Sequence, residues 1–155
     1  MISLFLRIPA HGEDVSIIAA AHIETIATEG SVWLGAIGRG LSGQNREKLR
    51  KQGEYLYLVQ WLGRQCQAYR GKIVDVADRL PLDERKLAPA YYGIQNVFAQ
   101  AKVWVKLTSL EQIKAEEVAT LSVLSTGTRI PRLIHSMTSL AIVVRDAERR
   151  AVAIG

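Results

Sequence analysis

Apolar and polar residues alternate in short segments along the chain, and this pattern predicts a domain that mixes strands and helices. Six apolar segments bounded by Gly, Pro, Ser or charged residues predict strands: SLFLRIP, SVWLGAI, EYLYLVQ, CQAYRGKIVDV, AKVWVKL and SLAIVVR. Between the first two, GEDVSIIAAAHIETIATEG carries apolar residues at helical spacing. This spacing predicts a helix that begins near Asp14 or Ser16 and ends at Gly30.

The remaining segments carry weaker signals. WLGRQ contains Gly63 and predicts a hairpin turn between EYLYLVQ and CQAYRGKIVDV. REKLRKQ and RLIHSM predict short helices, and SLEQIKAEEVATL predicts a longer helix capped by Ser109. RLPLDERKLAPAYYG contains Pro81 and Pro89 and therefore predicts a long loop.

Composition indicates one globular domain. The chain has 155 residues, of which 48% are hydrophobic and 23% are charged. The lone Cys66 excludes an internal disulfide framework and a cysteine-rich zinc site, which fits the cytoplasm. No apolar run approaches the ~18 residues of a membrane helix, so no membrane partner is expected. We expect one domain over residues 1–145 and a C-terminal extension over residues 146–155 that leads toward a further domain.

The positive charge is concentrated in one segment of the chain. The formal net charge is +5, and residues 39–72 contain eight Lys or Arg residues against two Glu residues. A solvated basic surface is the plain interpretation of such a segment. Clustering of this kind also favours a polyanionic partner such as nucleic acid.

The basic segment begins with a glycine motif, GRGLSG, which spells G-x-G-x-x-G. A dinucleotide site would need an apolar-faced helix directly afterwards and an acid about 20 residues on. The next segment, QNREKLRKQGE, has Leu49 as its one apolar residue, and no acid lies near position 63. We therefore expect these glycines to let a basic loop approach a phosphate backbone closely.

The order of elements and several short motifs over residues 28–144 resemble the YTH and EVE branches of the PUA-like superfamily. Trp33 in GSVW matches a tryptophan that forms one wall of an aromatic cage in YTH domains. YLYLVQ and CQAYRGKIVDV match the hairpin of that family, with YRGKI in place of the usual G-F/Y-A run. AKVWVKLTSLEQI and STGTRIPRLIHSMTSLAIVV resemble its closing strand and helix and its terminal loop and strand. The second and third cage walls of the family have no clear match.

The resemblance implies an α+β fold, a PUA-like and mostly antiparallel β-barrel flanked by helices. It also implies a non-catalytic module that takes an unstacked base of a nucleic acid into a pocket, without cofactor or metal. Such domains often serve as specificity domains of bacterial modification-dependent restriction enzymes, beside an effector nuclease or NTPase domain. Modified, typically methylated, DNA is the favoured ligand by this resemblance, and modified RNA is the alternative.

Aromatic residues are the candidate walls of such a pocket, because an extruded base must regain its stacking energy on aromatic faces. Trp33 is the first candidate, with burial in the core as its alternative. Tyr91 and Tyr92 lie in the expected loop after Pro89, where paired aromatic residues have less packing reason to occur. The complete set of candidates is Trp33, Tyr91, Tyr92 and Tyr69.

Basic residues of the same segments are the candidate phosphate contacts. In AKVWVKL, Trp104 alternates with two lysines, so we expect it to lie outside the dry core, against either sugar–phosphate or a helix. The candidate backbone contacts are Arg39, Arg46, Lys48, Arg50, Lys102, Lys106, Arg129 and Arg132.

An enzyme is the less favoured interpretation. His11, His22 and His135 are scattered without metal-ligand spacing. Glu84 and Lys86 form an acid-x-Lys pair of the kind some nucleases use, but the expected loop provides no strand to position it. A small enzyme with an unrecognised site remains the second alternative.

Overall fold

The computed structural model describes residues 1–136 and 138–146, so most of the expected extension, residues 147–155, lies outside the described residues. All six expected strands are confirmed, and two short ones join them. The strands are β1 (Ile2–Ile8), β2 (Val32–Ile37), β3 (Gly53–Leu62), β4 (Gln65–Ala77), β5 (Ala101–Leu107), β6 (Glu111–Ile113), β7 (Leu121–Val123) and β8 (Leu140–Arg145). The helices are α1 (Val15–Glu29), α2 (Gly43–Gln52), α3 (Tyr91–Ile94), α4 (Val97–Gln100) and α5 (Ala115–Ala119), with 3-10 helices η1 (Leu82–Leu87) and η2 (Ile130–His135).

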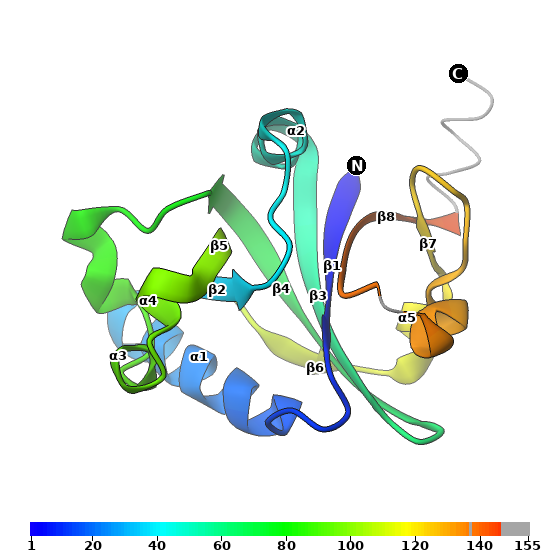
Figure 1. The fold of residues 1–155 in the computed structure, drawn as a ribbon, viewed down its shortest axis with the longest axis horizontal. Coiled ribbons are helices and arrows are strands. Elements are labelled where there is room, and N and C mark those ends of the chain that lie inside the picture. Colours follow the sequence, from blue (N-terminus) through cyan, green and yellow to red (C-terminus); the bar gives the residue numbers. More distant parts are fainter. Residues whose placement is uncertain (137, 147–155) are drawn as a thin grey trace.

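The strands form one mixed sheet in an α+β fold. Its order is β2-β5-β4-β3-β1-β8-β7, with β6 paired to β4 beside this path. β1 and β3 are parallel, and the other paired strands are antiparallel. Figure 1 shows β2 and β7 on opposite sides of β1. Since no pairing among the described residues joins β2 to β7, the sheet stays open and does not close into the expected barrel.

Helix α1 begins and ends where the sequence predicts. The carboxylate of Asp14 accepts a hydrogen bond from the Ser16 N–H at 2.8 Å, which caps the first turn. Gly30 follows the last turn with a φ of 87°, a left-handed conformation that favours glycine. Val15 and Ala19 of this helix are fully buried, so α1 packs its apolar face against the sheet.

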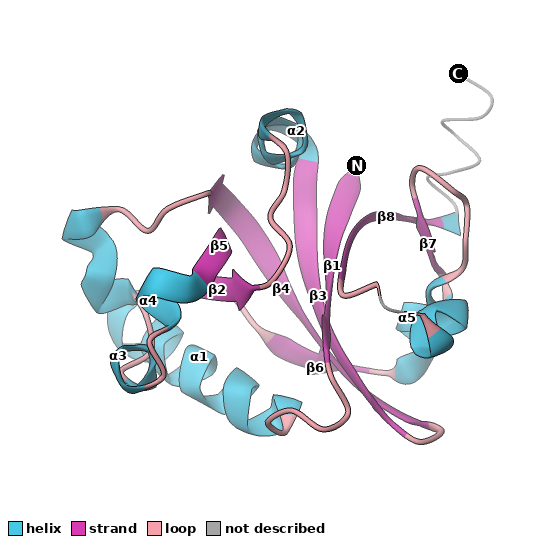
Figure 2. Cartoon of the chain, viewed as in Figure 1, coloured by secondary structure: helices cyan, strands magenta, loops and turns pink. Residues whose placement is uncertain are grey.

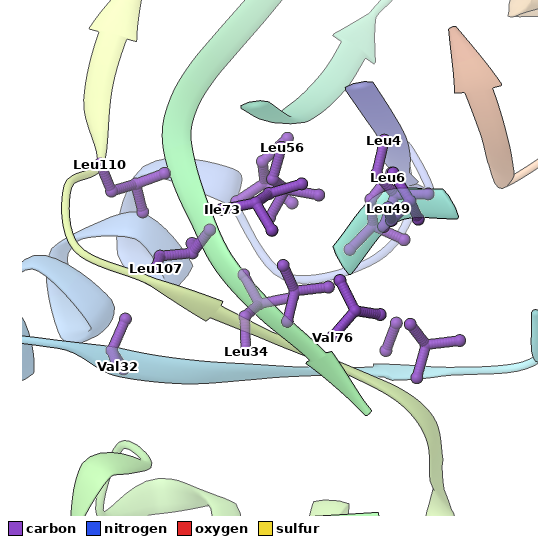
Figure 3. Close-up of a cluster of buried hydrophobic side chains, with 14 of the residues drawn as sticks. Leu4, Leu6, Val32, Leu34, Leu49, Leu56, Ile73, Val76, Leu107 and Leu110 are labelled. Atoms are coloured by element: carbon purple, nitrogen blue, oxygen red, sulfur yellow. The ribbon is translucent and has the colours of Figure 1, made fainter. Parts of the chain in front are cut away.

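The core consists of three clusters of buried side chains. The largest lies between the sheet and helices α1 and α2 and includes Leu4, Leu34, Leu56 and Leu107 (Figure 3). A second surrounds Phe5 and contains residues of β3, β8 and η2. The third lies beneath α3 and α4 and contains the tryptophans of β2 and β5. Figure 2 shows α1, α3 and α4 gathered at the β2 end of the sheet, with α5 near β7.

Three sequence-based expectations are wrong, each because tertiary packing overrides a local pattern. SLEQIKAEEVATL is split into β6 and α5, since Glu111–Ile113 pairs with β4. The Ser109 hydroxyl accepts from the Lys72 N–H instead of capping a helix. The expected long loop contains η1 and α3. Trp104 lies against α3 and α4, which is one of its two expected positions, but it is 1% exposed and therefore belongs to the core.

Candidate nucleic-acid groove

Two cavities lie in the gap that the open sheet leaves between β2 and the β1–β8 side. The first, the tyrosine cavity, is lined by residues 34–37 of β2, the end of β1, Tyr91 and Tyr92, and has a volume of about 460 Å³. The second, the loop cavity, lies between residues 39–42, which follow β2, and residues 123–126 and 138–142 of the β7–β8 side. Its volume is about 710 Å³. Ile37 and Ser139 line the first cavity, and Arg39 and Thr138, close to them in the chain, line the second. The two cavities are therefore neighbours along the same two segments, and together we call them the groove.

A buried hydrogen-bond chain fixes the inner end of the tyrosine cavity. The Tyr92 hydroxyl accepts from the Gly35 N–H at 3.1 Å and lies 2.5 Å from His22 Nε2. His22 Nδ1 lies 2.7 Å from the Ile18 carbonyl oxygen, which can only accept. The proton of a neutral His22 therefore resides on Nδ1, and Nε2 accepts from Tyr92. Burial lowers the pKa of His22 to about 4, which keeps the ring neutral near pH 7.

The two tyrosines meet edge to face in this cavity. Their ring centroids lie 4.9 Å apart with an interplanar angle of 87°. Burial raises the pKa of Tyr91 to about 12 and holds the pKa of Tyr92 well above its usual value, so both hydroxyls stay protonated. Tyr92 is buried, whereas Tyr91 is half-buried at the rim. A ligand in the cavity would therefore meet the Tyr91 ring first.

The backbone of β2 adds polar groups to the groove. The Gly35 N–H donates to Tyr92 instead of β5, so the peptide groups of Gly35 face the open edge of the strand. The exposed side chains of Glu13 and Gln95 also line the tyrosine cavity. A cavity of this volume with apolar walls and a few polar groups suits a planar small ligand or a single base.

The structure brings together two of the four predicted pocket residues. Tyr91 and Tyr92 share the tyrosine cavity, as above. Trp33 is fully buried in the cluster beneath α3 and α4 (Ala77, Leu87, Tyr92 and Trp104 among others). Tyr69 lies on β4, half-buried against the largest core cluster. In this conformation neither Trp33 nor Tyr69 lines the groove.

Glu84 explains how Trp33 is held. The Trp33 Nε1–H donates to one carboxylate oxygen of Glu84 at 2.8 Å, and Lys106 Nζ donates to the other at 2.8 Å. The hydrogen bond from Lys106 lowers the pKa of Glu84 most, and the bond from Trp33 lowers it further. Glu84 thus attaches η1 to β2 and β5. Its partner in the sequence motif, Lys86, lies on the exposed side of η1.

The predicted phosphate contacts divide into paired and unpaired cations. Four of them contact acids or carbonyls: Arg46 (Leu41 O at 2.8 Å, Asp78 at 3.9 Å), Arg50 (Val76 O at 2.7 Å, Asp75 at 3.3 Å), Lys106 (Glu84) and Arg129 (Asp146 at 2.7 Å). Arg39, Lys48, Lys102 and Arg132 have no ion pair within the described part of the chain. Arg39 and Lys48 line the loop cavity.

Sequence reasoning missed Arg7, which also lines the tyrosine cavity. Its guanidinium donates to the carbonyl oxygens of Leu133 and Ser136 at 2.7 and 3.0 Å and lies 5.4 Å from the Trp61 ring centroid. Arg7 therefore attaches the end of η2 to β1 at one wall of the groove. The available signal was a single cation inside the otherwise apolar segment SLFLRIP.

No family model, curated protein or solved structure matches this chain. No helix in the described residues has the length and apolar character that a membrane span requires. Residues 1–136 and 138–146 likewise contain no cluster of three or more His, Cys, Asp or Glu side chains that could hold a metal ion.

Proposed function

We propose that this domain is a PUA-like module of the EVE or YTH type that binds nucleic acid along the groove. One base leaves the stack and enters the tyrosine cavity, where the Tyr91 ring and the open edge of β2 contact it. The preferred ligand is DNA that carries a modified, typically methylated, base. The domain itself is the specificity module of a modification-dependent restriction system, and an effector nuclease or NTPase domain carries out the cleavage.

One observation carries this proposal: the tyrosine cavity lies beside a cavity lined by the unpaired cations Arg39 and Lys48. Arg39 and Lys48 lie along the groove without an acid partner among the described residues. A cation without an internal partner is available to contact a phosphate. The groove therefore combines the two contacts that an extruded nucleotide needs, a planar wall for its base and positive charge for its backbone.

The energetics of base extrusion fit this arrangement. Extrusion costs a few kcal/mol of stacking and pairing, and one aromatic stack returns about 1–3 kcal/mol. Tyr91 provides such a face at the cavity rim. A methyl group on the base adds apolar area that gains from burial against the aliphatic wall, which includes Leu34 and Ile37. The stacking energy nearly offsets the cost of extrusion, so the small free energy gained by burying the methyl group decides whether a modified base binds better than an unmodified one.

The test is a set of binding measurements by fluorescence anisotropy. The probes are one duplex with and without N6-methyladenine, the same duplex with and without 5-methylcytosine, the single strands, and the matching RNA. Tyr91→Ala should abolish the preference for one modified duplex, and Tyr91→Phe, which keeps the ring, should retain it. Arg64→Gln, an exposed cation at the β3–β4 turn, is the control. Equal binding of all duplexes with tighter binding of modified RNA would assign the module to RNA, and absence of binding to every probe would overturn the proposal.

A further inference from the structure

A third cavity lies outside the groove, between the segment after β4 and the outer side of α4 and β5. This arginine cavity has a volume of about 570 Å³ and is lined by residues 78–82, Arg85, Phe98, Lys102 and Trp104 among others. The chain at Gly40 forms the wall between it and the loop cavity. A Cβ atom on Gly40 would lie 3.5 Å from the Lys102 Cβ, while Gly40 itself lines the loop cavity. The arginine cavity and the loop cavity are therefore neighbours, and the backbone at Gly40 separates them.

Three cations surround this cavity without a matching number of acids. Arg79, Arg85 and Lys102 line it, and none of them forms an ion pair within the described residues. Asp78 is the single acid in its lining, and its carboxylate faces Arg46 at 3.9 Å. The cavity therefore carries a net positive charge that favours an anionic ligand.

The floor of the arginine cavity is a layered set of planar groups. Phe98 stacks on Trp104 with ring centroids 6.1 Å apart and an interplanar angle of 17°. The Arg85 guanidinium lies over the Phe98 ring, with Cζ 4.0 Å from the centroid. Arg85 is exposed, so its guanidinium plane is accessible from solvent. Guanidinium planes supported in this way are surfaces on which nucleic-acid bases stack.

We propose that the arginine cavity binds a nucleoside monophosphate. The base stacks on the guanidinium of Arg85 as the next layer above Phe98, and the phosphate is held by Arg79 and Lys102. Neither the aromatic floor nor the cations alone would select this ligand. A free phosphate lacks the stacking surface, and a neutral base makes no use of the charge.

Two sources can supply this chemistry, a free nucleotide or one unit of a strand that also occupies the groove. The segment that forms this wall contains Gly38 and Gly40. Gly38 has a φ of 118°, and a Cβ there would meet no atom within 4 Å. Arg39 lies beside it, exposed and without an ion pair in the described residues. A strand that crosses this wall would pass Arg39 between the two cavities. The nucleotide site itself does not depend on the function proposed for the groove.

The experiment is a titration of the ¹⁵N-labelled chain followed by NMR. The ligands are dAMP, deoxyadenosine, inorganic phosphate and a single-stranded hexanucleotide. Amide resonances of Ala99 and Ala101, which line the arginine cavity, report on this site, and the amide of Leu124 reports on the groove. The variants are Arg85→Gln and Lys102→Gln, with Arg64→Gln and Lys114→Gln as matched controls of exposed cations elsewhere.

The expected result is a saturable shift of Ala99 and Ala101 with dAMP, at least tenfold tighter than with deoxyadenosine or phosphate. Each cavity variant should weaken this binding about tenfold, and the controls should not. A hexanucleotide that shifts both reporters and binds more tightly than dAMP identifies the strand as the source, whereas dAMP alone shifting Ala99 and Ala101 identifies a free nucleotide. Absence of dAMP shifts at these amides, or equal affinity for phosphate, overturns the proposal. Binding of the hexanucleotide at Leu124 tests the groove separately.

Discussion

The hydroxyl of Tyr92 lies 2.5 Å from Nε2 of His22 and 3.1 Å from the N–H of Gly35, at the inner end of the tyrosine cavity. The three groups form one directed chain, because the Gly35 N–H donates to the hydroxyl and the hydroxyl donates to the imidazole. This chain joins α3 to α1 and to the edge of β2. The hydrogen bonds of Tyr92 therefore fix the inner wall of the tyrosine cavity, against which a base would lie.

Tyr92→Phe should destabilise the fold without removing the aromatic face. The substitution leaves the Gly35 N–H and the buried His22 Nε2 without their partner, at a cost of about 1–3 kcal/mol. Urea denaturation followed by far-UV circular dichroism measures this cost. Tyr69→Phe is the control, since Tyr69 makes no hydrogen bond through its side chain within the described residues. Equal stability of both variants would contradict the assigned chain.

The free energy of unfolding should depend on pH through His22. Burial lowers its pKa from 6.5 to about 4, so between these values the unfolded chain binds a proton that the folded chain does not. This contribution to stability is complete above about pH 6.5 and decreases by up to about 3 kcal/mol as the pH falls to 4. His22→Gln should lower this pH dependence. The measurement is the free energy of unfolding as a function of pH for wild type and variant. The difference between the two slopes isolates His22, because the contributions of other groups cancel.

Trp33→Ala should unfold or strongly destabilise the domain. Its ring is fully buried and its indole N–H is bonded to Glu84, so truncation leaves a cavity and removes the donor to one Glu84 oxygen, while Lys106 still pairs with the other. The expected loss is about 3–5 kcal/mol. Thermal melts of Trp33→Ala and Trp33→Phe would measure it, with the smaller loss in Trp33→Phe. A near-normal melt combined with lost discrimination between modified and unmodified duplexes would instead support Trp33 as a cage wall.

Gly35→Ala should destabilise the domain although its φ is ordinary for other residues. An added Cβ would lie 2.9 Å from Cη2 and Cζ3 of Trp104 and 3.1 Å from the Ala101 Cβ. The Trp104 ring is 1% exposed and contacts the rings of Tyr92 and Phe98, so it cannot shift without disturbing them. We expect a loss of about 1–3 kcal/mol. Gly63→Asn in the β3–β4 turn is the comparison. Its φ of 65° lies where asparagine is tolerated, and no atom lies within 4 Å of its added Cβ. A loss for Gly63→Asn as large as for Gly35→Ala would contradict the close approach to Trp104 as the cause.

Salt dependence should separate the unpaired cations of the groove from surface charge in general. Each phosphate contact contributes about 0.9 to the slope of log affinity against log salt on duplex DNA. Arg39→Gln and Lys48→Gln should each lower this slope by about that amount, because neither cation has an acid partner in the described residues. Arg64→Gln should leave it unchanged. A slope that is the same in all three variants would exclude Arg39 and Lys48 as backbone contacts.

Local sequence patterns were sufficient to locate the ends of α1, the β3–β4 hairpin and six strands. Asp14 and Gly30 mark the two ends of α1, and Gly63 marks the β3–β4 hairpin, because caps and turns depend on the conformations and hydrogen bonds of a few neighbouring residues. Alternating apolar segments likewise located six strands. Each of these features depends on contacts between residues close in the chain, which a local pattern encodes.

Long-range packing determines which aromatic rings and which cations are available to a ligand. Trp33 lies inside because α3 and α4, more than 50 residues after β2 in the chain, cover it. Lys106 is neutralised by Glu84 and Arg129 by Asp146, pairs that are far apart in the sequence. Burial and ion pairing depend on such contacts between residues that are far apart in the chain. No local pattern encodes these contacts, so residues of the same type occur both in the core and at the candidate sites.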